Sequence, residues 1–450
     1  MSVKLQDRGQ TAIPKGRKWR WPAVWELWIR QVALAPFVLT SSPLLYRLAW
    51  LWRRALVRTT FIAITGSVGK TTAKELLADI LASRGRTFRS LGNQCGGLMV
   101  SLNVLRVRPW HRFAVLEIGV TRPGSMRPLA RVVRPDVAVI LTALRTHTQG
   151  FESLDEHAAE KAVLLESLRP GGLAVLNGDD PRVARMADRG EFRVCLTGTS
   201  PDFDLWASDV SSRWPERLSL RAHRGEESCE MKTQLLGVHW APVLMAALGA
   251  AGHLGISLAD AARVLRRAAP YPARLDPVPF PNGTVIIRDE YSASVDTLEV
   301  SLRVMREARA ERRVLVLTDF SDAGLNRRAR LRSLAAAVSG WAGLLVLTGE
   351  EHEYGRRKAI ESGMPPETVH SFPSLKQAAE FVKTELRPGD LVLLKGRTTD
   401  HATRLFFAQL GTVACWREPC RKTMLCDSCW ELGFRPADAP QPAPGARRAC

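Results

Sequence analysis

A short segment of the sequence combines glycine, lysine and threonine in an order that suits phosphate binding. Residues 65–72 read TGSVGKTT, between the apolar run TFIAIT (60–65) and the helix-like pattern AKELLADILASRG (73–85). Glycines let backbone N–H groups turn toward an anion, and a helix that begins there adds a favourable dipole. In such loops the lysine reaches the outer phosphates and the next hydroxyl binds Mg²⁺. The segment therefore predicts a nucleotide phosphate site made by Gly66, Ser67, Gly69, Lys70, Thr71 and Thr72, although Ile64 stands where the strict motif begins with glycine.

An acid near the end of another apolar run supplies a second candidate Mg²⁺ ligand. Glu117 lies in FAVLEI (113–118). The carboxyl ends of parallel strands meet at one edge of a sheet, where ligands of α/β proteins bind. Hard cations such as Mg²⁺ take carboxylate and hydroxyl oxygens. Thr71 and Glu117 are therefore predicted to bind one Mg²⁺ together.

The elements that must carry these residues alternate between strand and helix patterns. Helical patterns such as 157–168 separate short apolar runs at 60–65, 113–118, 136–141 and 174–177. This alternation indicates an α/β fold, with a parallel sheet and helices on both faces. Alternating runs at 203–236 suggest an antiparallel appendix, and prolines at 270–281 mark a domain boundary. A second α/β unit follows, with strands predicted at 285–287, 314–318, 344–348 and 391–394.

Length and composition indicate a multidomain protein of a reducing compartment. The chain has 450 residues, of which 46% are hydrophobic, enough for about three domains. Eight cysteines do not make a disulfide scaffold, and the N-terminus lacks the pattern of a cleavable signal peptide, so a cytoplasmic location fits best. We predict a basic, Trp-rich helical segment, a nucleotide-binding domain, a second α/β domain and a Cys-rich tail with a disordered end, at 1–59, 60–272, 273–408 and 409–450.

Positive charge is concentrated near the N-terminus. The net charge is +19, and residues 1–60 hold eleven basic and two acidic residues, which leaves +9 there. The remaining chain is only mildly basic, which argues against a protein that coats nucleic acid. Six of the thirteen tryptophans also lie in these 60 residues. Because Trp favours the headgroup level and Lys and Arg favour anionic lipid, we predict helical pieces at 16–58 on the inner face of the cytoplasmic membrane.

Two other interpretations of this segment remain open. In one, its helices pack on the body of the protein and the tryptophans belong to the core. In the other, it crosses the membrane once. The longest uncharged run, 31–46, has only sixteen residues and is interrupted by Pro36 and Pro43, whereas a spanning helix needs about 20.

Four cysteines stand close together near the C-terminus. They follow the pattern Cys415-x4-Cys420-x5-Cys426-x2-Cys429. Four thiolates within fifteen residues suit one tetrahedral Zn²⁺ of the structural type. The gap between the two pairs is shorter than in common zinc ribbons, so an iron–sulfur cluster or free, redox-active thiols remain alternatives.

Beyond these motifs, residues 60–408 resemble the Mur ligase family, and within it the ligases that add D-alanyl-D-alanine to a UDP-muramoyl-tripeptide. The segments that carry the resemblance are ITGSVGKTTAKELL, GNQCGG, AVLEIGVTRPGSM, THTQGFESLDEHAAEKAVLLESLRPGGLAVLNGDDPRV, GVHWAPVLMAALGAAGHLGISLADA, YPARLDPV, RDEYSASVDTL and VLLKGR. The resemblance implies a central P-loop ATPase domain, a Rossmann-like C-terminal domain and ATP-driven amide formation. In that reaction a carboxylate acceptor attacks the γ-phosphoryl group, ADP leaves, and the amine of an amino acid or dipeptide then displaces phosphate.

The resemblance also assigns roles to individual residues. It places Lys70 on the phosphates and Thr71 with Glu117 on a first Mg²⁺. It makes His147 a metal ligand and Lys161 a carbamylated lysine that helps to hold a second Mg²⁺, an arrangement that neutralises charge between the reacting oxygens. The remaining assignments are nucleotide contacts by Asn177, Asp180, His239, Asp289 and Tyr291, a γ-phosphate contact by Arg274 when the domains close, and the C-terminal KGS-type lysine at Lys395.

The chain also departs from the family pattern. RDEYSASV replaces DDxYNANP, so Ser292 and Ser294 stand where the family has asparagines, and KGS becomes KGR with Arg397. His-Asn at the start of the 239 helix is here His239-Trp240. Residues 1–59 are too few for the family's UDP-sugar domain. A short membrane-adhering segment before a Mur-type domain also resembles poly-γ-glutamate capsule synthetases, which suits a lipid-linked or polymeric acceptor.

Two functional hypotheses follow. The first is an ATP-dependent carboxylate–amine ligase that acts on a cell-envelope or acyl-polymer precursor at the membrane surface. The second is a nucleotide-binding, membrane-associated scaffold or regulatory protein without ligase chemistry, which the altered DEYSASV and HWAPV segments favour. Retention of the phosphate and metal residues favours the enzyme, because a scaffold does not need a second set of metal ligands.

Overall fold

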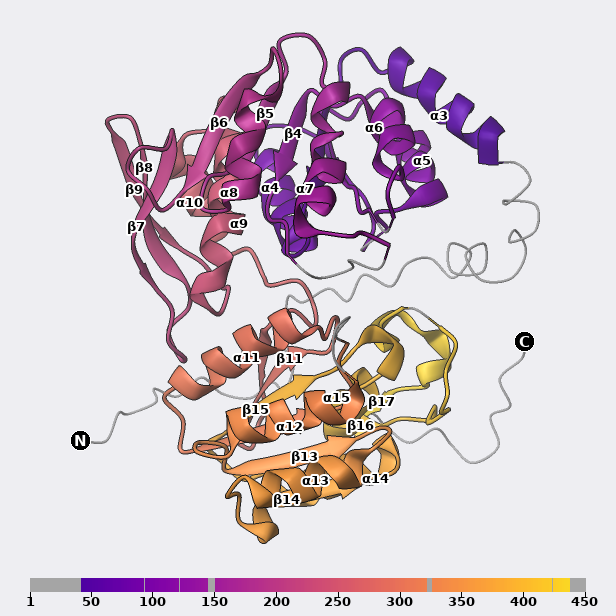
Figure 1. Ribbon diagram of the computed structural model, residues 1–450, viewed down its shortest axis with the longest axis vertical. Helices are drawn as coiled ribbons and strands as arrows, with labels where there is room; N and C mark the ends of the chain where they lie inside the picture. Colours follow the sequence, from indigo (N-terminus) through magenta and orange to yellow (C-terminus); the bar gives the residue numbers. More distant parts are fainter. Residues whose placement is uncertain are drawn as a thin grey trace.

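Two α/β units, each built on its own sheet, make up most of the described part of the chain (Figure 1). The computed structural model describes residues 42–437, apart from 93, 121, 145–149, 322–325 and 423. The two units lie one above the other in Figure 1, and the last described residues form a small extension on the second unit.

The central unit is built on a nine-stranded sheet. Its order is β2-β3-β1-β4-β5-β6-β7-β8-β9, parallel as far as β7 and antiparallel from β7 to β9. The strands are β1 (Thr60–Thr65), β2 (Thr87–Arg89), β3 (Phe113–Glu117), β4 (Val137–Ile140), β5 (Leu173–Asn177), β6 (Arg193–Gly198), β7 (Leu205–Ser211), β8 (Ser219–Arg224) and β9 (Glu227–Lys232). Inner parallel strands are buried on both faces, which is why they read as continuous apolar runs. The antiparallel appendix predicted at 203–236 corresponds to β7–β9.

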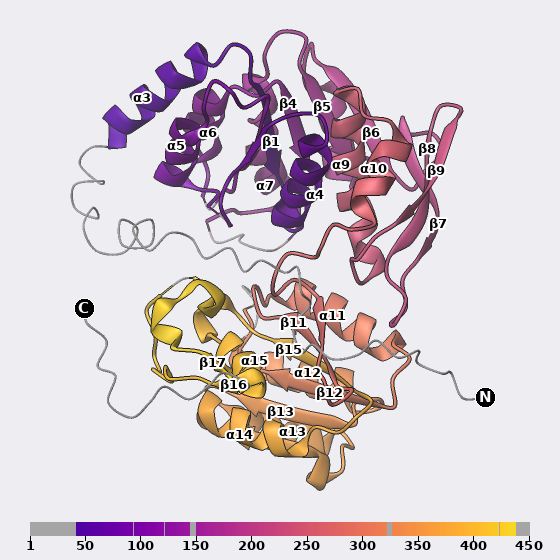
Figure 2. The same ribbon diagram turned by 180° about the vertical axis from the view of Figure 1, so that it is seen from behind.

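Helices cover both faces of this sheet, and each face has its own hydrophobic core (Figures 1 and 2). One face carries α4 (Lys70–Ala82), α9 (Ala241–His253) and α10 (Leu258–Leu265). The other carries α3 (Ser42–Ala55), α5 (Gly97–Arg106), α6 (Met126–Val133) and α7 (Leu154–Ala162), and the short α8 (Pro181–Ala184) follows β5. This layering places the N-terminus of α4 at the carboxyl end of β1.

The second unit is built on a six-stranded sheet of order β10-β11-β15-β12-β13-β14, parallel except for β10. Its strands are β10 (Asp276–Pro279), β11 (Val285–Asp289), β12 (Arg312–Leu317), β13 (Leu344–Thr348), β14 (Val369–Phe372) and β15 (Asp390–Lys395). Its helices are α11 (Val295–Glu307), α12 (Arg327–Val338), α13 (His352–Glu361), α14 (Leu375–Glu385) and α15 (Thr403–Leu410). The α/β fold with two parallel-sheet units is thus confirmed.

The C-terminal extension packs on the second unit rather than hanging free. It contains the two-residue strands β16 (Gly411–Thr412) and β17 (Arg435–Pro436) and two short turns of helix at Cys426–Ser428 and Trp430–Leu432. Cys426 and Leu432 are buried in the core under α14 and α15. The disordered end predicted for the tail lies outside the described residues.

The N-terminal helix α3 packs on the central unit. Arg53 is buried, with its Nε donating to the Val133 carbonyl at 2.8 Å and its Nη2 paired with Asp136 at 3.1 Å. The outer face of α3 stays exposed at Leu44, Leu48, Trp50 and Leu51. The described part of the 16–58 segment therefore contacts the body of the protein. Its first part lies outside the described residues. None of the helices within the described ranges is long and apolar enough to cross a membrane.

Candidate functional site

The phosphate loop forms the turn between β1 and α4, as the sequence predicts. Two glycines make this turn, and at both an added Cβ would collide with a neighbour. At Gly69, φ is 83°, and a Cβ would stand 2.6 Å from Val243 Cγ2 of α9. Lys70 Nζ donates to the carbonyls of Gly66 at 2.7 Å and Ser67 at 3.2 Å. The lysine side chain therefore folds back over the loop that is predicted to bind phosphate.

Thr71 and Glu117 meet beside this loop. The Thr71 hydroxyl donates to Glu117 Oε2 at 2.9 Å, and both side chains are buried. Parallel pairing of β1 with β3 sets this contact, because Ile64 lies opposite Glu117 in the sheet. The pair presents oxygen donors at the edge where the loop would hold phosphates, and this donor chemistry fits Mg²⁺.

Lys161 lies buried on α7, with its amine 2.5 Å from His157 Nε2 one helical turn earlier. Burial, and next the charge of Lys70, lower the pKa of Lys161 to about 7. A sizeable fraction of the amine is therefore uncharged at neutral pH, which is the form that reacts with CO₂. The predicted metal ligand His147 lies outside the described residues.

Asn177 ends β5, Asp180 follows it, and both organise the loops at the same edge of the sheet. Asp180 Oδ2 accepts from the backbone N–H of Ala143 at 2.8 Å, and its Oδ1 accepts from Arg182 N–H at 3.0 Å. Asn177 Oδ1 accepts from the backbone of Asp179 at 3.2 Å. The next residue, Leu144, donates its N–H to Ser67 Oγ of the phosphate loop at 2.8 Å. By holding Ala143, Asp180 therefore also helps to hold the phosphate loop.

A buried lysine that the sequence argument did not single out shapes the loop opposite. Lys74 of α4 is fully buried, and its Nζ donates to the carbonyls of Ser90 at 2.6 Å and Gly92 at 2.7 Å. Its charge is balanced by Glu75 at 2.8 Å. Lys74 thereby ties the start of the GNQCGG segment to the helix of the phosphate loop. The sequence could have indicated this buried lysine, because it lies among the apolar positions of α4.

The second unit brings Arg274, Asp289, Tyr291 and Lys395 together. Lys395 Nζ pairs with Asp289 Oδ2 at 2.6 Å, and both side chains are buried. The Arg274 guanidinium lies 4.2 Å from the centre of the Tyr291 ring. Burial and next the neighbouring Tyr271 raise the pKa of Tyr291, Arg274 opposes this, and the Glu117 carboxylate of the central unit raises it further. Tyr291 therefore lies within electrostatic reach of Glu117, and Arg274 packs on the tyrosine ring.

His239 stands just before α9, in the turn Val238–Trp240. Burial, and next the charge of Lys395, lower the pKa of His239 to about 3. The ring is therefore neutral at physiological pH. A Cβ added at the nearby Gly237 would stand 2.5 Å from the His239 ring and 3.0 Å from Val304 of α11, so His239 lies where the second unit meets the central one.

Two departures from the family pattern have structural explanations. Ser294 is the N-cap of α11: its hydroxyl accepts from the Thr297 N–H at 3.3 Å, and Thr297 Oγ1 accepts from the Ser294 N–H at 2.9 Å. Serine and asparagine are comparable N-caps, so this helix start survives the exchange. Arg397 pairs with Asp400 at 2.7 Å and Asp319 at 3.1 Å, which ties its guanidinium to the second unit.

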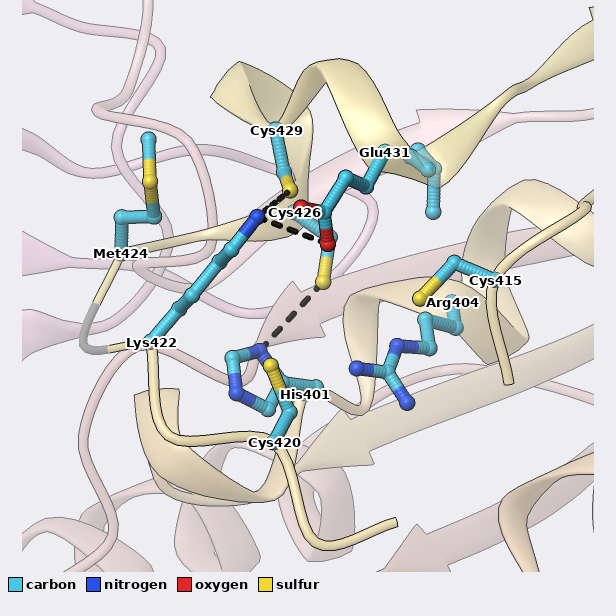
Figure 3. Close-up of a pocket in the computed structure, with 10 residues that line it drawn as sticks. His401, Arg404, Cys415, Cys420, Lys422, Met424, Cys426, Cys429 and Glu431 are labelled. Atoms are coloured by element: carbon cyan, nitrogen blue, oxygen red, sulfur yellow. Dashed lines mark hydrogen bonds and ion pairs between the residues drawn. The ribbon is translucent and has the colours of Figure 1, made fainter. Parts of the chain in front are cut away.

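The four C-terminal cysteines line one small cavity together with His401 (Figure 3). Cys426 Sγ lies 3.4 Å from His401 Nδ1. Over the part of the chain that is described, no three His, Cys, Asp or Glu side chains already stand at metal-binding distances. The described structure thus does not support the Zn²⁺ site that the four-cysteine pattern predicts, although the four thiols line one cavity.

Comparison with known proteins agrees with this architecture. Residues 64–251 match the Mur ligase middle domain, and residues 273–398 match the Mur ligase glutamate ligase domain. The UDP-N-acetylmuramoyl-tripeptide–D-alanyl-D-alanine ligase of Mycobacterium tuberculosis (strain CDC 1551 / Oshkosh) is 28% identical over 375 residues, covering 79% of this chain and 72% of that protein. The Bacillus subtilis (strain 168) ligase of the same name is 28% identical over 343 residues, covering 75% and 73%.

Solved structures give the same result for the fold. MurF from Acinetobacter baumannii superposes with a TM-score of 0.75 at 23% identity, covering 81% of this chain and 79% of that one. MurF ligase from Thermotoga maritima, solved in complex with ADP, superposes with a TM-score of 0.69 at 20% identity, covering 82% and 83%. With both domain matches spanning most of its length, the chain belongs to the Mur ligase family of ATP-dependent, amide-forming ligases.

Proposed function

We propose that this ligase joins the carboxylate of a cell-envelope precursor to the amine of an amino acid or dipeptide. The relatives named above add D-alanyl-D-alanine to a UDP-N-acetylmuramoyl-tripeptide. The observation that carries the proposal is the grouping of Lys70, the Thr71–Glu117 pair and the buried amine of Lys161 at one edge of the central sheet. Nucleotide binding alone does not require a buried lysine with a lowered pKa.

Different residues are proposed to bind the phosphates, hold the metal ions and orient the reacting groups. Lys70 exchanges its two carbonyl partners for the outer phosphates of ATP, and Arg274 reaches the γ-phosphate from the second unit. Thr71 and Glu117 would hold one Mg²⁺, and Lys161, once carbamylated, would hold a second with His147. Bound there, Mg²⁺ supplies neutralisation of the charge between carboxylate and phosphoryl oxygens. The substrate carboxylate then attacks the γ-phosphorus as ADP leaves, and the amine attacks the resulting acyl carbon as phosphate leaves.

Asn177, Asp180, His239, Asp289 and Tyr291 are proposed to complete the nucleotide site. Asp289 is already engaged by Lys395, which keeps both side chains ordered at the carboxyl ends of β11 and β15. His239, held neutral, donates or accepts a hydrogen bond without adding charge beside Lys395.

We further propose that the enzyme works at the cytoplasmic face of a membrane. The exposed leucines of α3 lie at positions 44, 48 and 51, which form one helical face; Arg47 on the same helix and Arg58, three residues after its end, are also exposed. An apolar face flanked by basic residues suits the surface of anionic lipid. A lipid-linked or polymeric acceptor would then meet the active site without leaving the membrane.

The deciding experiment measures ADP and phosphate release by the full chain with defined acceptors. We expect release that depends on one carboxylate acceptor and one amine, drawn from UDP-N-acetylmuramoyl-tripeptide with D-alanyl-D-alanine or glutamate oligomers with amino acids. Lys70→Ala and Lys161→Ala should abolish it, whereas Lys376→Ala on the exposed face of α14 should not. ATP binding without acceptor-dependent turnover, unaffected by Lys161→Ala, would contradict the proposal.

A further inference from the structure

The C-terminal extension encloses a cavity whose walls carry soft metal donors. The cavity measures about 10 Å³ and lies between the extension and the start of α15. Its walls include His401, Lys422 and the four C-terminal cysteines. A space of this size holds about one water molecule or one small ion. None of the described cysteines is in a disulfide, so every sulfur in this cavity is available as a thiol.

One distance in the cavity already matches the edge of a metal coordination polyhedron. Cys426 Sγ and His401 Nδ1 are 3.4 Å apart, and both residues are buried. A sulfur about 2.3 Å and a nitrogen about 2.0 Å from a tetrahedral Zn²⁺ stand about 3.5 Å from each other. His401 belongs to the second unit, 25 residues before Cys426, so the sequence spacing of the cysteines did not indicate it.

A positive charge lies beside one of the cavity's cysteines, where it would stabilise a thiolate. Lys422 Nζ lies 3.4 Å from Cys429 Sγ and 2.9 Å from Glu431. In Figure 3 the sulfurs of Cys420, Cys426 and Cys429 lie on the side of His401 and Lys422, whereas Cys415 enters from the side where Arg404 lies. Three thiolates and a neutral imidazole leave a Zn²⁺ site with one negative charge, and the nearby Lys422 ammonium balances it.

We propose that this cavity binds one structural Zn²⁺ through Cys420, Cys426, Cys429 and His401. His401 thus takes the place that the sequence pattern gave to Cys415. On binding, the three thiols lose their protons to solvent and form zinc–sulfur bonds, and His401 Nδ1 donates its lone pair. The sulfurs reach the metal by rotation about χ1, the single torsion that places a cysteine sulfur.

The metal would brace the second unit through Asp427, which lies between two of its ligands. Asp427 accepts from Arg288 at 2.7 and 2.8 Å, and Arg288 is fully buried in β11. Arg288 also pairs with Glu290 at 2.5 Å. Fixing Cys426 and Cys429 on either side therefore holds the carboxylate that neutralises a buried charge next to Asp289.

The test is the metal content of the full chain, which is independent of the proposed ligase activity. We expect about one zinc per chain by elemental analysis. After exchange of zinc for Co²⁺, we expect the visible absorption of a tetrahedral, sulfur-bound cobalt. An iron–sulfur chromophore, or a chain that neither retains zinc nor gives this cobalt spectrum, would overturn the proposal, and neither measurement needs a variant to fold.

Matched variants then test the ligand set. His401→Ala and Cys426→Ser should lose most of the zinc, whereas His401→Cys should keep it, because a thiolate replaces the imidazole. Cys415→Ser, from the same cavity, and Cys195→Ser, from the central unit, should retain it. Zinc loss in Cys415→Ser equal to that in Cys426→Ser, with full zinc in His401→Ala, would show that the four cysteines alone form the site.

Discussion

At the scale of single residues, Lys161 has the environment most unlike that of an ordinary surface lysine. Its buried amine, with a pKa lowered to about 7, can take up CO₂ and become an anionic ligand. We predict that Lys161→Ala lowers turnover by about 100-fold or more, since it removes several kcal/mol of charge stabilisation. Acetate or formate should restore part of the turnover by filling the vacated space with a carboxylate. Lys70→Ala should not be rescued, and equal rescue of both variants would contradict a carbamate at Lys161.

His239 makes a prediction about pH and stability. Burial lowers its pKa to about 3 from the usual 6.5. Between these values the unfolded chain binds a proton on His239 that the native chain does not, so its contribution to stability is present above pH 6.5 and is lost as pH falls toward 3. His239→Gln should therefore lose less Tm than the wild type between pH 7 and 4.5. His370→Gln, on the edge strand β14, serves as the control, and parallel Tm curves for His239→Gln and the wild type would refute the expectation.

At the scale of elements, the turn between β1 and α4 depends on glycine for two separate reasons. Gly69 has φ of 83°, and a Cβ would also collide with Val243 of α9. A left-handed backbone costs a non-glycine residue about 1–2 kcal/mol, and the collision adds to it. We predict at least a tenfold loss of ATP affinity in Gly69→Ala, measured by titration. Gly171 has φ of 71° and no atom near an added Cβ. Gly171→Ala should therefore lower Tm through backbone strain and leave the ATP affinity unchanged.

The exposed face of α3 carries the prediction for membrane association. Replacing Leu44, Leu48 and Leu51 by serine should lower binding to anionic vesicles at least tenfold, because burying one leucine contributes about 1.5–3 kcal/mol. Co-sedimentation at low and high salt separates the apolar contribution from that of the arginines. Trp430→Ser, which removes an exposed aromatic from the C-terminal extension, is the matched control. Unchanged vesicle binding by the α3 variant would exclude this face as the contact.

Much of this architecture was predictable from local sequence patterns. Inner strands such as β1 and β3 are buried on both faces and leave continuous apolar runs, and the phosphate loop leaves its glycines and lysine. Contacts across long separations leave no such trace. Asp289 and Lys395 are 106 residues apart, and only the resemblance to a family named both. His157 lies four residues before Lys161 on one helix, and this spacing could have indicated their contact. The contact was missed because an isolated histidine does not by itself indicate a particular chemistry.

At the scale of the whole molecule, the C-terminal extension is joined to the second sheet by a buried ion network that no sequence pattern indicated. Arg288 and Asp427 are 139 residues apart, and the Arg288 side chain is fully buried between Asp427 and Glu290. Its pKa is raised by these two carboxylates against the opposing effect of burial. Removing one partner of a buried pair is costly because the remaining charge keeps its desolvation penalty.

The extension therefore ought to stabilise the unit that carries Asp289 and Lys395. We predict that Asp427→Ala lowers the free energy of unfolding by about 3 kcal/mol, which corresponds to roughly 6–12 °C in the Tm of a domain of this size. Glu299→Ala, which removes an exposed carboxylate 3.5 Å from Arg303 on α11, should change Tm little, because exposed ion pairs contribute about 0–1 kcal/mol. If the two variants have the same Tm, Asp427 does not stabilise the sheet. If only Asp427→Ala melts early, the extension is an integral part of the second unit and not an appended tail.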